Sequence, residues 1–353
     1  TAQVLKQGEV QGSDVAAHSA GVLDIKTTIL PDADALFLTA IDRYGHELWR
    51  WTFPVNKLNQ ANEVLSPLSN KVTSTETENE LTVKAKNHTF IFSKKDGQLK
   101  GVSVNNRKIS FANGPRFIGA RRADRSLDQF YNHDDEKAKE KDRTYSEFPD
   151  AAVFTKLDVK EDGGNLIVTA NYKLGNLDKA QWTISPSGDL VLDYTYNFSG
   201  VVDLMGICFD YPEDQVISKR WLGAGPYRVW QNRIHGTQYD VWENDYNDPI
   251  PGETFTYPEF KGYFGSVSWM NIRTKEGTIS LTNETPDAYI GVYQPRDGRD
   301  RLLYTLPESG ISVLNVIPPV RNKVNSTDLC GPSSQPKWVN GPQSGRIIFR
   351  FME

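Results

Sequence analysis

Short stretches in which apolar and polar residues alternate recur along most of the chain. Residues 35–41 and 47–55 have this period of two, and the run from Leu190 to Phe198 alternates cleanly. Successive side chains of a β-strand point to opposite faces, so this alternation predicts strands with one buried face. No segment repeats its apolar residues with helical spacing, and we expect a helix content well below about one third.

Turn-forming residues separate these stretches. Asp96-Gly97 lies between the alternating segments 88–93 and 99–104, and Asp-Gly in such a place is a strong signal for a hairpin. Longer polar stretches, at 120–150 and 318–345, are expected to be surface loops. Further strands are expected at residues 22–30, 81–85, 150–160, 166–172, 180–184, 278–282, 288–292, 311–317 and 346–351.

Many short strands with turns between them predict an all-β chain, in which a large antiparallel β-supersandwich follows part of a small β-sandwich. We place the partial sandwich at residues 1–58, a polar linker at 59–75 and the supersandwich at 76–353. The strands before residue 58 are too few for a stable sandwich, so its first strands are expected upstream of Thr1. The chain starts without Met and is expected to be a mature or excised piece, periplasmic or extracellular rather than cytoplasmic.

Composition and charge exclude several classes of function. The net charge of the 353 residues is −5, and basic side chains are mixed with acidic ones instead of forming the basic patch that binds nucleic acid. No apolar run approaches the ~20 residues that cross a bilayer, so no membrane insertion is expected. The histidines lack metal-ligand spacing, and phosphate-binding glycine loops are absent, so we expect no metal and no cofactor. Cys208 and Cys330 could form one bridge, but two buried thiols are the simpler interpretation.

The stretch from Trp221 to Trp269 differs from the rest in composition. It holds four of the chain's 8 tryptophans, several Tyr and Phe residues, and interleaved Asn, Asp, Glu and Arg. Sugar rings stack their C–H faces on aromatic rings, and their hydroxyls need planar polar partners, so this mixture indicates a carbohydrate surface. For any single aromatic residue, packing in the core or between domains is the competing interpretation.

Two catalytic arrangements are also possible in this stretch. Glycoside hydrolysis needs two carboxylates at a defined separation, and Glu243, Asp245, Asp248 and Glu259 are available. His235 with Glu259 could instead form an acid/base pair for sugar-ring opening, although a lone histidine is more often structural.

Three stretches carry a resemblance to a known family. They are Leu36–Glu47, then Gly223-Ala224-Gly225-Pro226-Tyr227 followed by Asn232-Arg233, and finally Tyr257–Gly262. In these stretches the chain resembles the C-terminal region of β-galactosidase-like enzymes of glycoside hydrolase family 2. That region comprises the end of a second immunoglobulin-like domain and a terminal β-supersandwich similar to galactose mutarotase. The chain departs from the pattern at Arg228, where a carboxylate is expected, and it lacks the Gln before Glu259.

The resemblance implies a carbohydrate-handling module without catalytic residues of its own. The module would support the galactoside site of a catalytic barrel that is absent from this chain, with the upstream domains of the same parent chain as partners. The residues expected to bind substrate are Trp230, Asn232, Arg233, Trp242, Tyr257, Glu259 and Lys261. Two alternatives stay open: a stand-alone mutarotase or epimerase that uses His235 or His133 with a carboxylate, and a non-catalytic carbohydrate-binding module.

Overall fold

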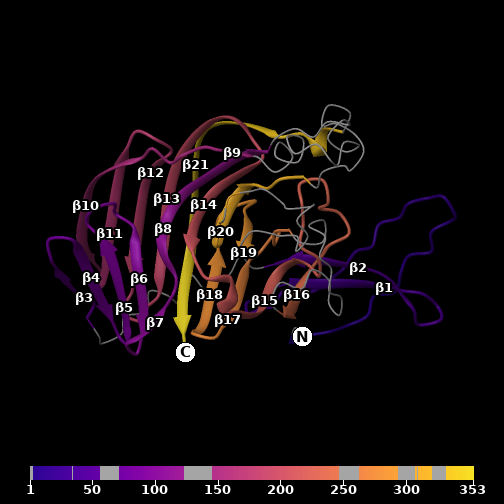
Figure 1. Ribbon diagram of the computed structural model, residues 1–353. Coiled ribbons are helices and arrows are strands. Elements are labelled where there is room, and N and C mark those ends of the chain that lie inside the picture. The colour runs from indigo at the N-terminus through magenta and orange to yellow at the C-terminus, as the bar shows by residue number, and fades with distance from the viewer. Residues whose placement is uncertain are drawn as a thin grey trace.

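The computed structural model describes residues 3–33, 35–55, 71–122, 145–245, 262–292, 307, 309–319 and 331–353. Within these residues nearly all regular structure is β-strand, and the helical elements are two short 3₁₀ turns, Glu213–Gln215 and Pro332–Ser334. The strands form a hairpin and two large antiparallel sheets (Figure 1). No helix in the described part is long and apolar enough to cross a membrane.

The nine-stranded sheet has β10 and β16 as its two edge strands. Its order is β10 (Val153–Asp162), β11 (Asn165–Lys173), β12 (Leu177–Ile184), β13 (Leu190–Val202), β21 (Lys337–Met352), β18 (Gly277–Asn283), β17 (Trp269–Thr274), β15 (Val216–Gly225) and β16 (Gln238–Asp245). Alternation in β13 places Leu192, Tyr194 and Tyr196 on the buried face and Asp193 and Thr195 on the other, as a strand with one buried face requires.

The ten-stranded sheet packs against the first. Its order is β19 (Tyr289–Val292), β20 (Ile311–Val316), β14 (Leu204–Asp210), β8 (Ala112–Arg122), β6 (Leu99–Val104), β5 (His88–Ser93), β4 (Glu80–Ala85) and β3 (Thr73–Glu76), with β7 (Arg107–Ile109) beside β6 and β9 (Tyr145–Glu147) beside β8. The core between the sheets is rich in aromatic rings, among them Trp182, Phe209 and Phe349. The predicted all-β antiparallel supersandwich is therefore confirmed.

A second, smaller core lies on the opposite face of the ten-stranded sheet. On β14, Ile207 and Phe209 belong to the main core, whereas Cys208 between them belongs to a cluster with Trp230 and Tyr263. The segment that contains Trp230 therefore covers this outer face. Cys208 is a buried free thiol, and Cys330 lies outside the described residues.

The third sheet is a hairpin of β1 (Ala35–Ile41) and β2 (Glu47–Pro54), which confirms both strands predicted there. It lies beside the edge strand β16, where the guanidinium of Arg50 is 3.6 Å from the carboxylate of Asp240. The predicted linker 59–75 lies mostly outside the described residues, and the division of the chain at that point stays a prediction.

Three sequence predictions are wrong in whole or in part. The loop predicted at 120–150 contains the last residues of β8, which ends at Arg122, and the short strand β9, which pairs with β8. Residues 22–30 have a strand-like sequence but form no strand, and they are exposed almost throughout, so the segment buries no apolar face against a sheet. The loop predicted at 318–345 is partly strand, since β21 begins at Lys337 and pairs with β13 without interruption from Lys337↔Val202 to Phe349↔Leu190. Backbone hydrogen bonds to the long strand β13 hold residues 340–345 extended, although their composition is typical of a turn.

Candidate functional site

The aromatic stretch starts on two paired strands at the edge of the nine-stranded sheet. Trp221 of β15 is opposite Trp242 of β16. Trp221 is fully buried, packs edge-to-face on Phe264 with 4.8 Å between ring centroids, and donates its indole N–H to the carbonyl of Ala224 at 3.0 Å. Trp221 is therefore a core residue.

Trp242 is half-buried and held from two sides. Its indole N–H donates to the carbonyl oxygens of Gly223 at 3.2 Å and Gln238 at 3.1 Å. The ring lies directly over Gly225, where an added Cβ would be 2.4 Å from the indole Cδ1. A glycine at this point of the Gly-Ala-Gly-Pro motif is thus required by the close approach of Trp242.

Trp230 lies in the interior. It is fully buried and packs edge-to-face on Tyr263, with 5.6 Å between ring centroids and 81° between the planes. The backbones of Val229 and Tyr263 exchange hydrogen bonds of 2.7 and 3.0 Å, which fix this segment on the outer core. In this structure Trp230 therefore supports the loop from beneath.

Asn232 and Arg233 lie at the surface of the loop between β15 and β16. Asn232 is half-buried and its amide donates to the Ser334 hydroxyl at 3.0 Å, whereas Arg233 is exposed. Neighbouring Gln231 donates to the carbonyl oxygens of Ser333 at 3.0 Å and Gln335 at 2.7 Å. Side chains of the loop are thus tied to residues 331–336, a contact between segments about 100 residues apart.

The remaining predicted residues are only partly described. Tyr257, Glu259 and Lys261 lie outside the described residues, as do Asp248 and His133. His235 is exposed on the loop, and Glu243 and Asp245 are exposed on the edge strand β16. Of the four described substrate-binding candidates, the structure brings Trp230, Asn232 and Arg233 together in one turn and places Trp242 separately, over Gly225.

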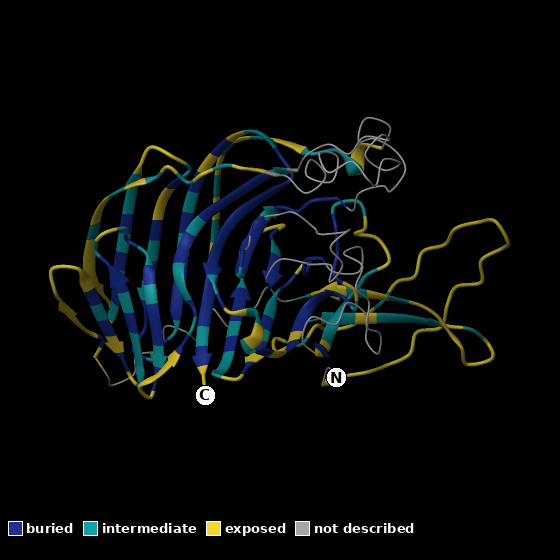
Figure 2. Ribbon diagram, in the orientation of Figure 1, coloured by how far each residue is buried: buried dark blue, intermediate teal, exposed yellow. Residues whose placement is uncertain are grey.

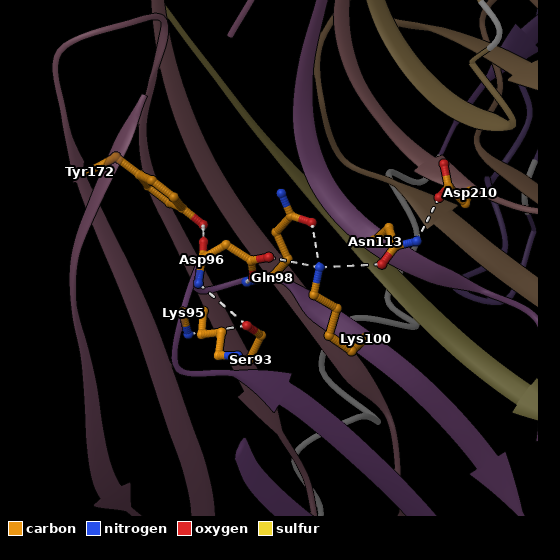
Figure 3. Close-up of polar contacts among 8 residues, drawn as sticks. All are labelled: Ser93, Lys95, Asp96, Gln98, Lys100, Asn113, Tyr172 and Asp210. Carbon is orange, nitrogen blue, oxygen red and sulfur yellow. Dashed lines mark hydrogen bonds and ion pairs between the residues drawn. The ribbon is translucent and has the colours of Figure 1, made fainter. Parts of the chain in front are cut away.

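Sequence reasoning missed a second polar arrangement, on the ten-stranded sheet. Strands β6 and β8 pair only at Leu99↔Gly114, so the sheet has a seam there. The ammonium of Lys100 on β6 is 2.8 Å from the carboxylate of Asp96 and donates across the seam to the side-chain oxygen of Asn113 at 3.3 Å (Figure 3). The hydrogen bond from Lys100 therefore joins the two halves of the sheet where the backbone ladder is shortest.

The chain of contacts continues from Asn113 to β14. The Asn113 amide donates to Asp210 at 2.7 Å, and Arg116 donates to the other oxygen of Asp210 at 2.6 Å (Figure 3 shows the Asn113 contact). We call Asp96, Lys100, Asn113, Asp210 and Arg116 the seam network. Its members come from a turn and three strands, so no local motif in the sequence could have predicted it.

The charges of the seam network are fixed near neutral pH. Partial burial acts to raise the pKa of the Asp210 carboxyl, but the hydrogen bonds from Arg116 and Asn113 outweigh it and hold that pKa below its ordinary value of 3.8. The pKa of Asp96 is lowered in the same way, by contacts that include Lys100. Burial raises the pKa of the adjacent Cys208 thiol to about 11. These groups suit structural charge pairing rather than proton transfer at neutral pH.

Asp210→Asn is expected to destabilise the chain at neutral pH and not in acid. The folded-state pKa of Asp210 is lowered, so its contribution is present above pH 3.8 and is lost as pH falls through the lower folded value. Because the carboxylate is about half exposed, solvent screening should limit the loss to about 1 kcal/mol. Urea unfolding of the wild-type chain and the variant, near pH 7 and near pH 3, measures this loss in the free energy of unfolding. Asp162→Asn, at an exposed position ending β10, is the control, and an equal loss at both pH values would contradict the assignment.

Comparison with known proteins gives one match in sequence and several in structure. Residues 84–317, more than half of the chain, match the family profile described as beta galactosidase small chain. No curated protein matches the chain. Among solved structures, galactose 1-epimerase from Lactobacillus acidophilus NCFM has a TM-score of 0.45 and 10% identity, over 81% of this chain and 99% of that one. A C. elegans aldose epimerase homologue has a TM-score of 0.39 and 7% identity, over 80% and 99%. At such TM-scores these structures carry no conclusion about function.

Proposed function

Since the chain belongs to the beta-galactosidase small chain family, we propose that it is the carbohydrate-handling, non-catalytic part of a β-galactosidase of the glycoside hydrolase family 2 type. In this role it supports the substrate site of a catalytic barrel that lies outside this chain. The observation that carries the proposal is the family match over residues 84–317, which spans most of the two large sheets.

The described part of the candidate site supports a binding role over a catalytic one. Arg233 has an exposed guanidinium, a group that hydrogen-bonds sugar hydroxyls, and the half-buried Asn232 beside it donates its amide to the Ser334 hydroxyl. Trp242 and Trp230 brace the two ends of the loop that carries them. Tyr257, Glu259 and Lys261, which lie outside the described residues, stay predicted sugar-binding residues.

The chain alone is expected to be inactive. Hydrolysis of a nitrophenyl β-galactoside and anomerisation of galactose should both proceed at the uncatalysed rate when this chain is added, because it lacks the catalytic barrel. A stand-alone mutarotase assayed in parallel is the positive control. Robust hydrolysis by the chain alone would refute the proposal, and fast anomerisation would favour a free-standing mutarotase.

A further inference from the structure

A cleft of about 320 Å³ lies on the face of the nine-stranded sheet that points away from the ten-stranded sheet. Thr195 of β13 and Ser344 of β21, which are opposed in the register, both line it. Lys179 of β12, the partner of Thr195, lies on one side. Glu284 and Pro286, which follow the end of β18, line the other side. The cleft is therefore built from four neighbouring segments of one sheet.

One guanidinium in this cleft is held between two carboxylates. Arg346 of β21 donates through Nη1 to the two carboxylate oxygens of Asp193, at 3.2 and 3.4 Å. Its Nε lies 3.1 Å from a carboxylate oxygen of Glu284. The main chain is fixed at the same point, because the backbone amide of Arg346 donates to the Thr285 hydroxyl at 3.0 Å. The guanidinium is thus oriented before any ligand binds, which lowers the entropic cost of binding.

The charges of the cleft indicate the class of ligand. Two cations, Lys179 and Arg346, line the cleft together with two anions, Asp193 and Glu284, so the four charges sum to zero. A ligand with several charges of one sign would meet like charge in the cleft. A neutral molecule rich in hydroxyl groups suits it better, because each hydroxyl both donates and accepts and finds N–H donors and carboxylate acceptors together.

An exposed stripe continues from the cleft along β21. Every second residue from Trp338 to Arg346 is exposed, and the residues between them are half-buried (Figure 2). At ~3.3 Å per residue the stripe is about 26 Å long. Opposed residues of an antiparallel pair share one side of a sheet, so the stripe includes residues of β13. We give the name β21 track to its uncharged part, which consists of Trp338, Asn340, Pro342 and Ser344 on β21 with Asn197 and Ser199 on β13.

Trp338 places an aromatic ring at the end of the β21 track that lies away from the cleft. Its side chain is 71% exposed, although tryptophan is highly buried on average. Sugar rings stack their C–H faces on such a ring. On the same side of the strand, the Asn340 side-chain oxygen accepts a hydrogen bond of 2.8 Å from Ser199, which orients its amide. Trp338 also follows closely on Ser334, whose hydroxyl accepts from Asn232 of the loop between β15 and β16. The β21 track therefore leads from the segment that holds this loop to the cleft.

We propose that the β21 track and the cleft together bind one extended neutral oligosaccharide. Trp338 stacks on one sugar ring, the amide and hydroxyl groups of the track bind the units that follow, and the cleft holds the other end. This site differs from the predicted sugar contacts of the loop, because it lies on the face of the sheet and is complete within this chain. Only the choice of galactose as the probe sugar rests on the proposed function.

The length of the ligand is the first test. The full chain is titrated by isothermal titration calorimetry with β-linked galactohexaose and with free galactose. We expect galactohexaose to bind at least about 10-fold more tightly, because only the longer ligand reaches both the ring and the cleft. Hexagalacturonate, of equal length but with a carboxylate on every unit, should bind more weakly than galactohexaose. No binding of galactohexaose, equal affinity for galactose, or tighter binding of hexagalacturonate would overturn the proposal.

Substitutions at the two ends of the site should each weaken binding. Trp338→Ala should raise the dissociation constant for galactohexaose about 10-fold, and Lys179→Met about 3-fold. The matched controls are Trp49→Ala, which removes a tryptophan that is 52% exposed on the hairpin, and Lys160→Met on the edge strand β10. Each control should change the dissociation constant by less than about 2-fold. A folded Trp338→Ala variant with wild-type affinity would refute the track.

Chemical protection tests the contact in the unaltered chain. Trp338 should be protected from oxidation by N-bromosuccinimide when galactohexaose is present, as measured by peptide mass spectrometry. Free galactose at the same concentration of sugar units should protect it less, and Trp49 should be oxidised equally in every sample. Equal oxidation of Trp338 with and without galactohexaose would contradict the proposal even if a substituted chain failed to fold.

Hydrolysis of a nitrophenyl β-galactoside separates this proposal from the proposed function, because that substrate has one sugar unit and cannot span the β21 track. If galactohexaose does not bind but the chain still raises hydrolysis by the catalytic part of the β-galactosidase, the track fails while the function stands. If galactohexaose binds and protects Trp338 but the chain leaves hydrolysis unchanged, the track stands and the function fails.

Discussion

A chain in which Trp182 is replaced by alanine is expected to have a free energy of unfolding about 4 kcal/mol lower than the wild-type chain. Trp182 on β12 is fully buried between the two large sheets. Its ring centroid lies 6.1 Å from that of Phe92, 6.0 Å from Phe209 and 6.5 Å from Phe349. These partners come from three strands in both sheets, so the cavity left by truncation cannot be closed by moving one strand.

Trp338→Ala is the matched control for this loss. Trp338 is the same residue type in the same sheet, but it is largely exposed on β21, and its truncation should change stability by less than about 0.5 kcal/mol. Urea unfolding followed by circular dichroism gives both values. Equal free energies of unfolding for the two variants would contradict the position of Trp182 at the centre of the core.

Gly206→Ala is expected to lower the free energy of unfolding by about 2 to 3 kcal/mol, for a different reason. An added Cβ at Gly206 would lie 2.1 Å from the carbonyl oxygen of Val313 and 2.7 Å from the Cα of Leu314. Both atoms belong to the backbone of β20, which the ladder holds against β14. Because backbone cannot rotate away as a side chain can, the two strands must separate.

Gly101→Ala tests whether the loss at Gly206 comes from this close approach. Gly101 lies within β6 of the same sheet, but a Cβ there would meet nothing nearer than the Ile91 side chain at 3.8 Å. Its stability should be unchanged or raised by up to about 1 kcal/mol, because alanine restricts the unfolded chain. Equal losses at both positions, measured by the same urea titrations, would contradict the steric explanation.

The period-two pattern was sufficient to predict the fold class and most strands. β13, β18 and β20 lie where alternation or a short apolar run placed them, because each buries one face against the core. The period-two pattern gave wrong predictions where pairing with another strand decides whether a segment becomes a strand. Residues 22–30 have strand-like sequence but form no strand, whereas residues 337–345 have turn-like sequence and pair with the long strand β13. A sequence window contains no information about the neighbouring strand.

The candidate site was predictable in composition but not in geometry. In the described part of the aromatic stretch, Trp221 and Trp230 are buried in two different cores, and Trp242 lies apart from Trp230, over Gly225. Only the burial of each ring distinguishes packing from ligand contact, and burial depends on strands far away in sequence. Asn232 and Arg233, which sequence placed beside the tryptophans, do lie at the surface. Their contact with sugar stays a prediction.

The most direct test of the central claim is the rate of nitrophenyl β-galactoside hydrolysis by the catalytic part of this β-galactosidase as the present chain is added. If the chain completes the sugar site, the rate should rise with added chain and saturate when one chain is bound per catalytic part, while the chain alone stays at the uncatalysed rate. A catalytic part that is fully active alone, and whose rate does not change when the chain is bound, would contradict the claim.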